Sequence, residues 1–116
     1  MNPKQITDDL EQLLEVLPLA VQDSLATKDS RENLIEVVLD LGRPPEARYP
    51  GKAVIIGTQN LSRDDLENIV KKIGEFGSDN RAGIERTLHR ISAIRNRQRN
   101  VIGLTCRVGR AVFGTV

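Results

Sequence analysis

Aromatic side chains are scarce in this chain of 116 residues, which contains no tryptophan, one tyrosine and two phenylalanines. Binding of single strands by base stacking needs a platform of aromatic rings, so we do not expect it here. Apolar residues make up 39% of the sequence, below the usual half. Leucine, isoleucine and valine must therefore supply the core of what the length predicts to be one domain.

Cysteine and histidine occur once each, as Cys106 and His89. A single cysteine excludes an intramolecular disulfide, and no Cys/His cluster is available to hold zinc. No segment approaches about 18 consecutive apolar residues, and the first seven residues lack the apolar core of a secretory signal. The sequence therefore predicts a reducing compartment, either the cytoplasm or an organelle of bacterial descent, and no membrane partner.

Catalytic motifs are also missing. Five residues separate Gly103 from Gly109, and Arg110 follows them, so this segment is not a P-loop. No serine lies in a nucleophile-elbow sequence, and no nucleophile motif accompanies His89. We therefore expect no catalytic residue, no metal and no cofactor in this chain. His89 is predicted to be a solvated surface residue, and Cys106 a small buried residue of a strand rather than a reactive thiol.

Charge is divided unevenly along the chain although the net charge is only +1. Residues 1–80 contain nine Lys/Arg and fifteen Asp/Glu, a net charge of −6, whereas residues 81–116 contain eight arginines and one glutamate, a net charge of +7. A chain that separates its charges in this way favours an anionic partner or self-association of acidic with basic surfaces.

The first half of the chain alternates helical and extended patterns. Leucines recur at helical spacing after an N-cap at Thr7, and Pro18 suits the start of a second helix over residues 18–26. Residues 27–31 are predicted to be a polar connection. Residues 34–41 alternate as in a strand, although a helix capped by Ser30 is an alternative. Further strands are predicted over residues 46–49 and 53–56, joined by a turn at residues 50–51.

The second half is predicted to contain two helices and a final strand. Ser62 and Asp65 form a capping box before an apolar stripe that ends at Gly74. A long helix is predicted from residue 79 or 80 to about residue 97, and a strand over residues 101–108. The buried stripe of the long helix would consist of Ile84, Leu88, Ile91 and Ile94. The fold class is therefore α/β (α+β) with a small, mainly antiparallel sheet.

The predicted long helix would carry an arginine ridge of Arg86, Arg90 and Arg97 on its outer side. Three interpretations fit this ridge: a solvated helix face, a surface that contacts nucleic-acid phosphates, or an interface with a neighbouring domain or subunit. Arg95 would fall within the apolar side, so it must extend to solvent, pair with Glu36 or Asp40, or lie beyond the helix end.

Three runs of sequence resemble a known family. They are LIEVVLDLGRPPEAR at residues 34–48, IGEFGSDNRAGIERTLHRISAIRNR at residues 73–97 and IGLTCRVGRAVFG at residues 102–114. They resemble the N-terminal region of cyanobacterial and plastid AAA ATPases similar to stage III sporulation protein AA. The resemblance extends over roughly residues 10–116.

The resemblance implies a function for the domain. In that family a Walker A loop and ATPase core come after this region, often followed by a small domain that binds single-stranded nucleic acid. ATP and Mg²⁺ are therefore implied for the core and not for these residues. More distantly, the family is similar to secretion-type ring ATPases, in which an arginine of the N-terminal domain reaches the bound nucleotide. By that analogy Arg107 and Arg110 would sense nucleotide or grip the next domain.

Together these expectations describe a single N-terminal domain without catalytic residues. Its function would be assembly of the ATPase, or docking to its core and to neighbouring subunits of a homo-oligomeric ring. The alternative is a nucleic-acid-binding module that acts through the arginine ridge.

Overall fold

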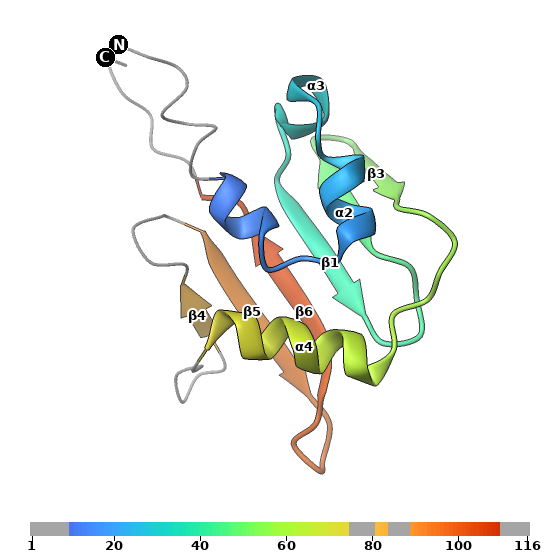
Figure 1. Ribbon diagram of the computed structural model, residues 1–116, viewed down its shortest axis with the longest axis vertical. Coiled ribbons are helices and arrows are strands. Elements are labelled where there is room, and N and C mark those ends of the chain that lie inside the picture. Colours follow the sequence, from blue (N-terminus) through green and yellow to red (C-terminus); the bar gives the residue numbers. More distant parts are fainter. Residues whose placement is uncertain (1–9, 75–80, 84–88, 110–116) are drawn as a thin grey trace.

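The computed structural model describes residues 10–74, 81–83 and 89–109. Six strands form one antiparallel sheet with the order β3-β2-β1-β6-β5-β4 (Figure 1). The helices lie on one face of this sheet (Figure 1). The α+β prediction is therefore confirmed. The strands are β1 (Glu36–Asp40), β2 (Glu46–Tyr49), β3 (Lys52–Ile55), β4 (Arg81–Gly83), β5 (Arg90–Arg95) and β6 (Val101–Arg107).

The N-terminal part consists of short helical segments. Residues 10–14 are helical, and α2 (Leu19–Ser24) follows with Pro18 at its N-cap, as predicted. The predicted cap at Thr7 lies outside the described residues. The predicted polar connection is wrong in part, because it contains a helical turn, α3 (Lys28–Arg31). The Oγ1 atom of Thr27 accepts a hydrogen bond from the backbone N–H of Ser30, which stabilises this turn.

Helix α4 (Arg63–Ile73) has the predicted bounds because both of its ends carry strong sequence signals. The Ser62 side chain accepts from the Asp65 backbone N–H, and the Asp65 carboxylate accepts from the Ser62 N–H. Gly74 ends the helix with a φ of +98°. Leu66 and Ile69 are buried, and α4 packs against β6.

The core lies between the helices and the inner face of the sheet. Alternate residues of the central strands are fully buried on this face, because side chains of a strand point to opposite sides at period two. The leucines of residues 10–17, predicted from their helical spacing, are buried against them. The buried strand residues include Val37, Leu39, Ile91, Leu104 and Cys106.

The predicted long helix over residues 79–97 is wrong. Its last part is strand β5, which pairs with β6 throughout and with β4 at its start. Ile91 and Ala93 face the core whereas Ile94 is 52% exposed, so the buried positions recur every second residue. The other two members of the predicted stripe, Ile84 and Leu88, lie outside the described residues.

Candidate functional site

Arg90 and Arg97 do not share the predicted arginine ridge, because the described part of this segment is strand β5 and a turn rather than a helix. Arg86 and Arg110 lie outside the described residues. Arg90 begins β5, whereas Arg97 lies beyond the other end of that strand, in the turn that leads to β6. Five steps of about 3.3 Å separate Arg90 from the end of β5, so these two arginines are more than about 15 Å apart.

Arg90 instead lies directly opposite Arg107 in the register of β5 and β6. We call these two residues the arginine pair. Both are exposed, and their neighbours Ile91 and Cys106 are buried, so the two arginines point to the sheet face opposite the core. Like charges placed directly opposite each other on neighbouring strands destabilise a sheet. Arg90 and Arg107 therefore repel each other. Glu36, which is opposite Arg107 on its other side, offsets part of this repulsion, and an anion beside Arg90 would relieve the rest.

Charged residues also occupy the positions next to the arginine pair on strands β1 and β2, and some of these charges are already compensated. Glu36 lies opposite Arg107 on one side and opposite Arg48 on the other. Arg48 donates from Nε to Glu46 at 2.9 Å and lies 3.9 Å from Glu36. The hydrogen bond to Glu46 raises the pKa of Arg48, and the charges of Glu46, Glu36 and Asp40 act in the same direction. Arg48 is thus paired.

The arginine pair differs from Arg48 because no ion pair joins Arg90 or Arg107 to a carboxylate within the described ranges. Arg107 is only the register neighbour of Glu36. Residues on the same open face include hydroxyls that can donate to an oxyanion, namely Thr105 and Ser92, which are opposite each other in the next row. This part of the sheet can therefore bind a carboxylate or a phosphate.

His89 lies next to this pair but is buried, with 1% of its surface exposed, so the prediction of a solvated histidine is wrong. Its Nδ1 atom accepts a hydrogen bond of 3.0 Å from the backbone N–H of Gly109. The N–H of Val108 in turn donates to the carbonyl oxygen of Ile35 at 2.9 Å. These two bonds hold the chain that leaves β6 against β1 and the start of β5, beside the arginine pair.

The opposite end of β5 and β6 carries a second basic surface. We call the segment from Arg95 to Asn100 the arginine hairpin; it includes Arg97 and Arg99, both exposed. Arg99 was not among the predicted site residues. The hairpin projects beyond α4 (Figure 1). The run of Arg, Asn and Gln between two apolar segments is a turn signal that could have revealed this hairpin from the sequence.

Hydrogen bonds within the arginine hairpin define its conformation. The N–H of Asn96 donates to the carbonyl of Asn100 at 3.0 Å, and the N–H of Arg99 donates to the carbonyl of Asn96 at 2.9 Å. The Asn96 side-chain oxygen accepts from the Asn100 N–H at 3.0 Å. Arg95 Nη1 donates to the carbonyl of Arg99 at 3.0 Å. Arg99 has a φ of +67°, the left-handed conformation.

Cys106 faces the core in β6 and is fully buried, as predicted. Burial raises the pKa of its thiol to about 12. The thiolate is the reactive form of cysteine, so the native protein keeps this residue inert.

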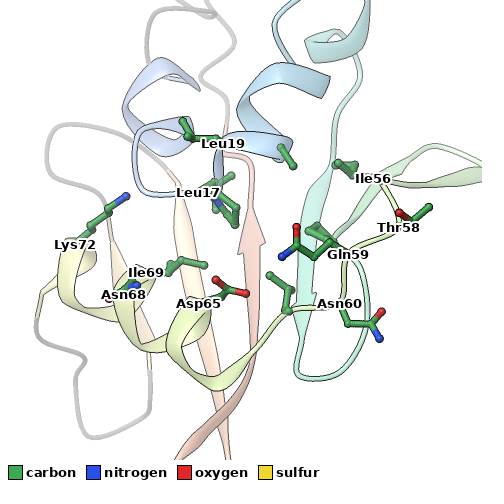
Figure 2. Close-up of a pocket in the computed structure, with 15 residues that line it drawn as sticks. Leu17, Leu19, Ile56, Thr58, Gln59, Asn60, Asp65, Asn68, Ile69 and Lys72 are labelled. Carbon is green, nitrogen blue, oxygen red and sulfur yellow. The ribbon is translucent and has the colours of Figure 1, made fainter.

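A groove of about 670 Å³ lies between α2, α4 and the segment 56–61 (Figure 2). Leu17, Ile56 and Ile69 contribute apolar side chains, while Gln59 and Asn68 contribute amides. Its lining includes one carboxylate, Asp65, which is engaged in the cap of α4, and one amine, Lys72. The groove thus offers hydrogen-bonding groups without an acid–base pair. Its remaining lining residues are Pro18, Leu19, Ala20, Pro45, Gly57, Thr58, Asn60 and Leu61.

No group of three or more His, Cys, Asp or Glu side chains in the described ranges could hold a metal ion. None of the described helices combines the length and apolarity needed to cross a membrane.

Comparison with known proteins returned no matching family model but found clear relatives. The chain is 60% identical over 111 residues to the protein ycf45 of Porphyra purpurea, a match that covers 96% of this chain and 20% of the relative. It is 54% identical over 109 residues to SEEDLING PLASTID DEVELOPMENT 1 of Arabidopsis thaliana, covering 94% and 16% respectively. The ycf45 protein of Cyanidium caldarium is 44% identical over 109 residues, which is 94% of this chain and 32% of that protein. The chain therefore spans a third or less of the length of these relatives.

Among solved structures, the fold is similar to part of the ATPase DotB of Legionella pneumophila. The TM-score is 0.51 with 17% sequence identity, and the match covers 79% of this chain and 29% of DotB. At this identity the likeness concerns the fold.

Proposed function

We propose that this chain is the N-terminal, non-catalytic domain of an AAA ATPase similar to stage III sporulation protein AA, and that it docks to the ATPase core or to a neighbouring subunit. Relatives several times longer than the chain leave room for such a core. The similarity in fold to part of an ATPase is consistent with this role. ATP and Mg²⁺ would bind to the core. The proposed location is the plastid stroma or the cytoplasm, and the name of the Arabidopsis relative supports the plastid.

The observation that carries the proposal is the arginine pair. Arg90 and Arg107 are exposed, directly opposed and unpaired within the described ranges. Planar guanidinium groups bind carboxylates and phosphates in a bidentate manner, so two of them side by side favour a partner that presents such groups. The bond between His89 and Gly109 holds the segment after β6 beside the pair. Arg107, and Arg110 beyond the described residues, are thus the candidates for contacting the core or its nucleotide.

A chimera tests this proposal. The matching region of Porphyra purpurea ycf45 is replaced by this chain, which is feasible at 60% identity. The chimera is compared with a version that carries Arg90→Glu and Arg107→Glu. Charge reversal should turn attraction to the partner into repulsion, so we expect a smaller oligomer in sedimentation velocity and a lower ATPase rate.

A matched control variant carries Lys71→Glu and Lys72→Glu, which make the same change in charge on the last turn of α4. This control should sediment and hydrolyse ATP like the unmodified chimera. If the arginine variant behaves like the control in both assays, the docking role of the arginine pair is wrong. If removal of residues 1–116 leaves the ATPase rate and the oligomer unchanged, the domain does not regulate the core.

A further inference from the structure

The arginine hairpin has no role in the docking function proposed above, because it lies at the opposite end of β5 and β6 from the arginine pair. It contains three arginines within five residues, together with two asparagines and one glutamine. Arg97 and Arg99 are exposed and form no ion pair with any residue in the described ranges. A fold gains no stability from gathering these charges in one turn, since like charges repel.

We propose that the arginine hairpin binds double-helical DNA by inserting into the major groove and contacting the phosphates on either side of it. Arginine is the side chain best suited to phosphate oxygens, and asparagine and glutamine donate to sugars, phosphates and base edges. Two paired strands are about 4.8 Å apart, so with their side chains they fit the major groove of B-form DNA, which is about 12 Å wide. The deep, narrow major groove of A-form RNA does not admit such a ribbon.

The composition of the hairpin favours nucleic acid over a protein partner. Protein interfaces depend on a desolvated centre that is enriched in aromatic and apolar side chains. The turn between β5 and β6 has none. Exposed apolar residues at this end of the sheet, Ile94 in β5 and Leu41 after β1, lie outside the turn. Single strands are also disfavoured, because their binding relies on aromatic stacking and the hairpin contains no aromatic residue.

The surroundings of the hairpin extend the basic surface. The N–H of Leu41 donates to the carbonyl of Ile102 at 2.9 Å, which places the end of β1 beside the start of β6. The turn after β1 carries Arg43, whose carbonyl accepts a bond of 2.9 Å from Leu61, close to the start of α4. Exposed Arg43 and Arg63 therefore lie at the same end of the sheet as the hairpin. Asp40, Asp64 and Asp65 are acidic residues close to Leu41 and the start of α4.

The conformation of the hairpin is set before any ligand binds. Four hydrogen bonds within residues 95–100 hold it, including the one from Arg95 to the carbonyl of Arg99. A preformed hairpin avoids the entropic cost of ordering a loop when it binds. Arg97, Arg99 and one of the neighbouring exposed arginines, Arg43 or Arg63, would make three phosphate contacts. Log K should then fall with log salt with a slope of about −2.7, so affinity should drop roughly 40-fold between about 50 and 200 mM salt.

The test is fluorescence anisotropy of the full 116-residue chain with a labelled 20-base-pair DNA duplex. The variant Arg97→Gln with Arg99→Asn removes two contacts, and Asn tolerates the positive φ at position 99. We expect its salt slope to fall to about −0.9, and its affinity to drop only about 3.5-fold over the same salt range. The variant Lys71→Gln with Lys72→Gln removes the same charge from α4 and should bind like the wild type.

Circular dichroism and thermal melting check that each variant is folded. The single variant Arg97→Gln changes an exposed turn position and provides a second measurement, with an expected salt slope of about −1.8. Equal slopes for the wild type and the hairpin variants would overturn the proposal, as would the absence of duplex binding at about 50 mM salt. Equal or tighter binding of single-stranded DNA or duplex RNA would overturn the assignment to the major groove. Displacement of the duplex by an equal charge concentration of polyglutamate would show that charge alone is recognised. None of these results bears on the arginine pair, so the docking proposal is tested separately.

Discussion

The buried thiol of Cys106 makes the stability of the domain depend on pH in a way that can be worked out. Burial raises the pKa of the thiol from 9.0 to about 12 in the folded state. Below pH 9 both states are protonated and the full stability is present; between pH 9 and 12 the unfolded state loses its proton first. The free energy of unfolding therefore falls as pH rises through this window. At pH 10 the free energy of unfolding is lower by about 1.4 kcal/mol because of this one group. The pH is then one unit above the pKa of the unfolded thiol, and each such unit corresponds to about 1.4 kcal/mol.

Urea denaturation of the wild type and Cys106→Ala at pH 7.5 and pH 10 measures this effect. Tyrosine and lysine titrate in both proteins, so only the difference between them belongs to the thiol. We expect the alanine variant to have a lower free energy of unfolding than the wild type at pH 7.5, because truncation leaves space in the core. Between pH 7.5 and pH 10, its free energy of unfolding should fall by about 1.4 kcal/mol less than that of the wild type. Parallel pH dependences would refute the argument, because they would mean that the thiol ionises as easily in the folded state as in the unfolded one.

Three further predictions concern stability and can be measured by thermal or urea denaturation. His89→Phe removes the acceptor for the Gly109 N–H and should cost about 1–3 kcal/mol, with faster hydrogen exchange at that amide; unchanged exchange would contradict the role of the bond. Ser62→Ala removes the cap of α4 and should cost about 1 kcal/mol, a loss that Ser62→Asp should largely avoid. Leu39→Ala should cost about 2–5 kcal/mol, whereas Ile94→Ala, at a position that is 52% exposed, should cost clearly less; similar losses would contradict the assignment of the two faces of the sheet.

The arginine pair and the arginine hairpin lie at opposite ends of strands β5 and β6, and this separation has a functional consequence. The arginine pair lies where β6 ends and the chain continues, whereas the arginine hairpin lies at the far end of the same strands. A rigid pair of strands can therefore connect a docking surface at one end with a DNA-binding surface at the other. Variants of one surface should leave the function of the other unchanged.

Elements with strong local signals could be predicted from the sequence. The capping box at Ser62 and the glycine at residue 74 define α4, and Pro18 with the following apolar spacing defines α2. The strands up to Ile55 follow from alternation on either side of a turn at residues 50–51. Each of these signals acts within a few residues, so it operates in the same way whatever the rest of the chain does.

Residues 90–95 could not be assigned in this way because their local pattern fits two structures. Ile91 and Ile94 lie three residues apart, as on a helix, but Ile91 and Ala93 also alternate with Ser92, as in a strand. Residues 90–95 form a strand because β6 pairs with them along their length and β4 pairs with their start. This pairing provides hydrogen-bond partners for the backbone N–H and C=O groups of β5. The same ambiguity produced the wrong ridge and the wrong exposure of His89, because both depended on the helical period.

The sequence by itself therefore determined the composition of the domain: a surplus of arginine after residue 80, a single cysteine, and apolar residues that are mainly leucine, isoleucine and valine. The tertiary structure decided which arginines are neighbours. Arg90 meets Arg107, and Arg95, Arg97 and Arg99 share one turn, only because β5 folds back on β6. The physical reason is that strand pairing joins residues far apart in the chain, whereas the periodicity within residues 90–95 fits both a helix and a strand and so does not specify a partner.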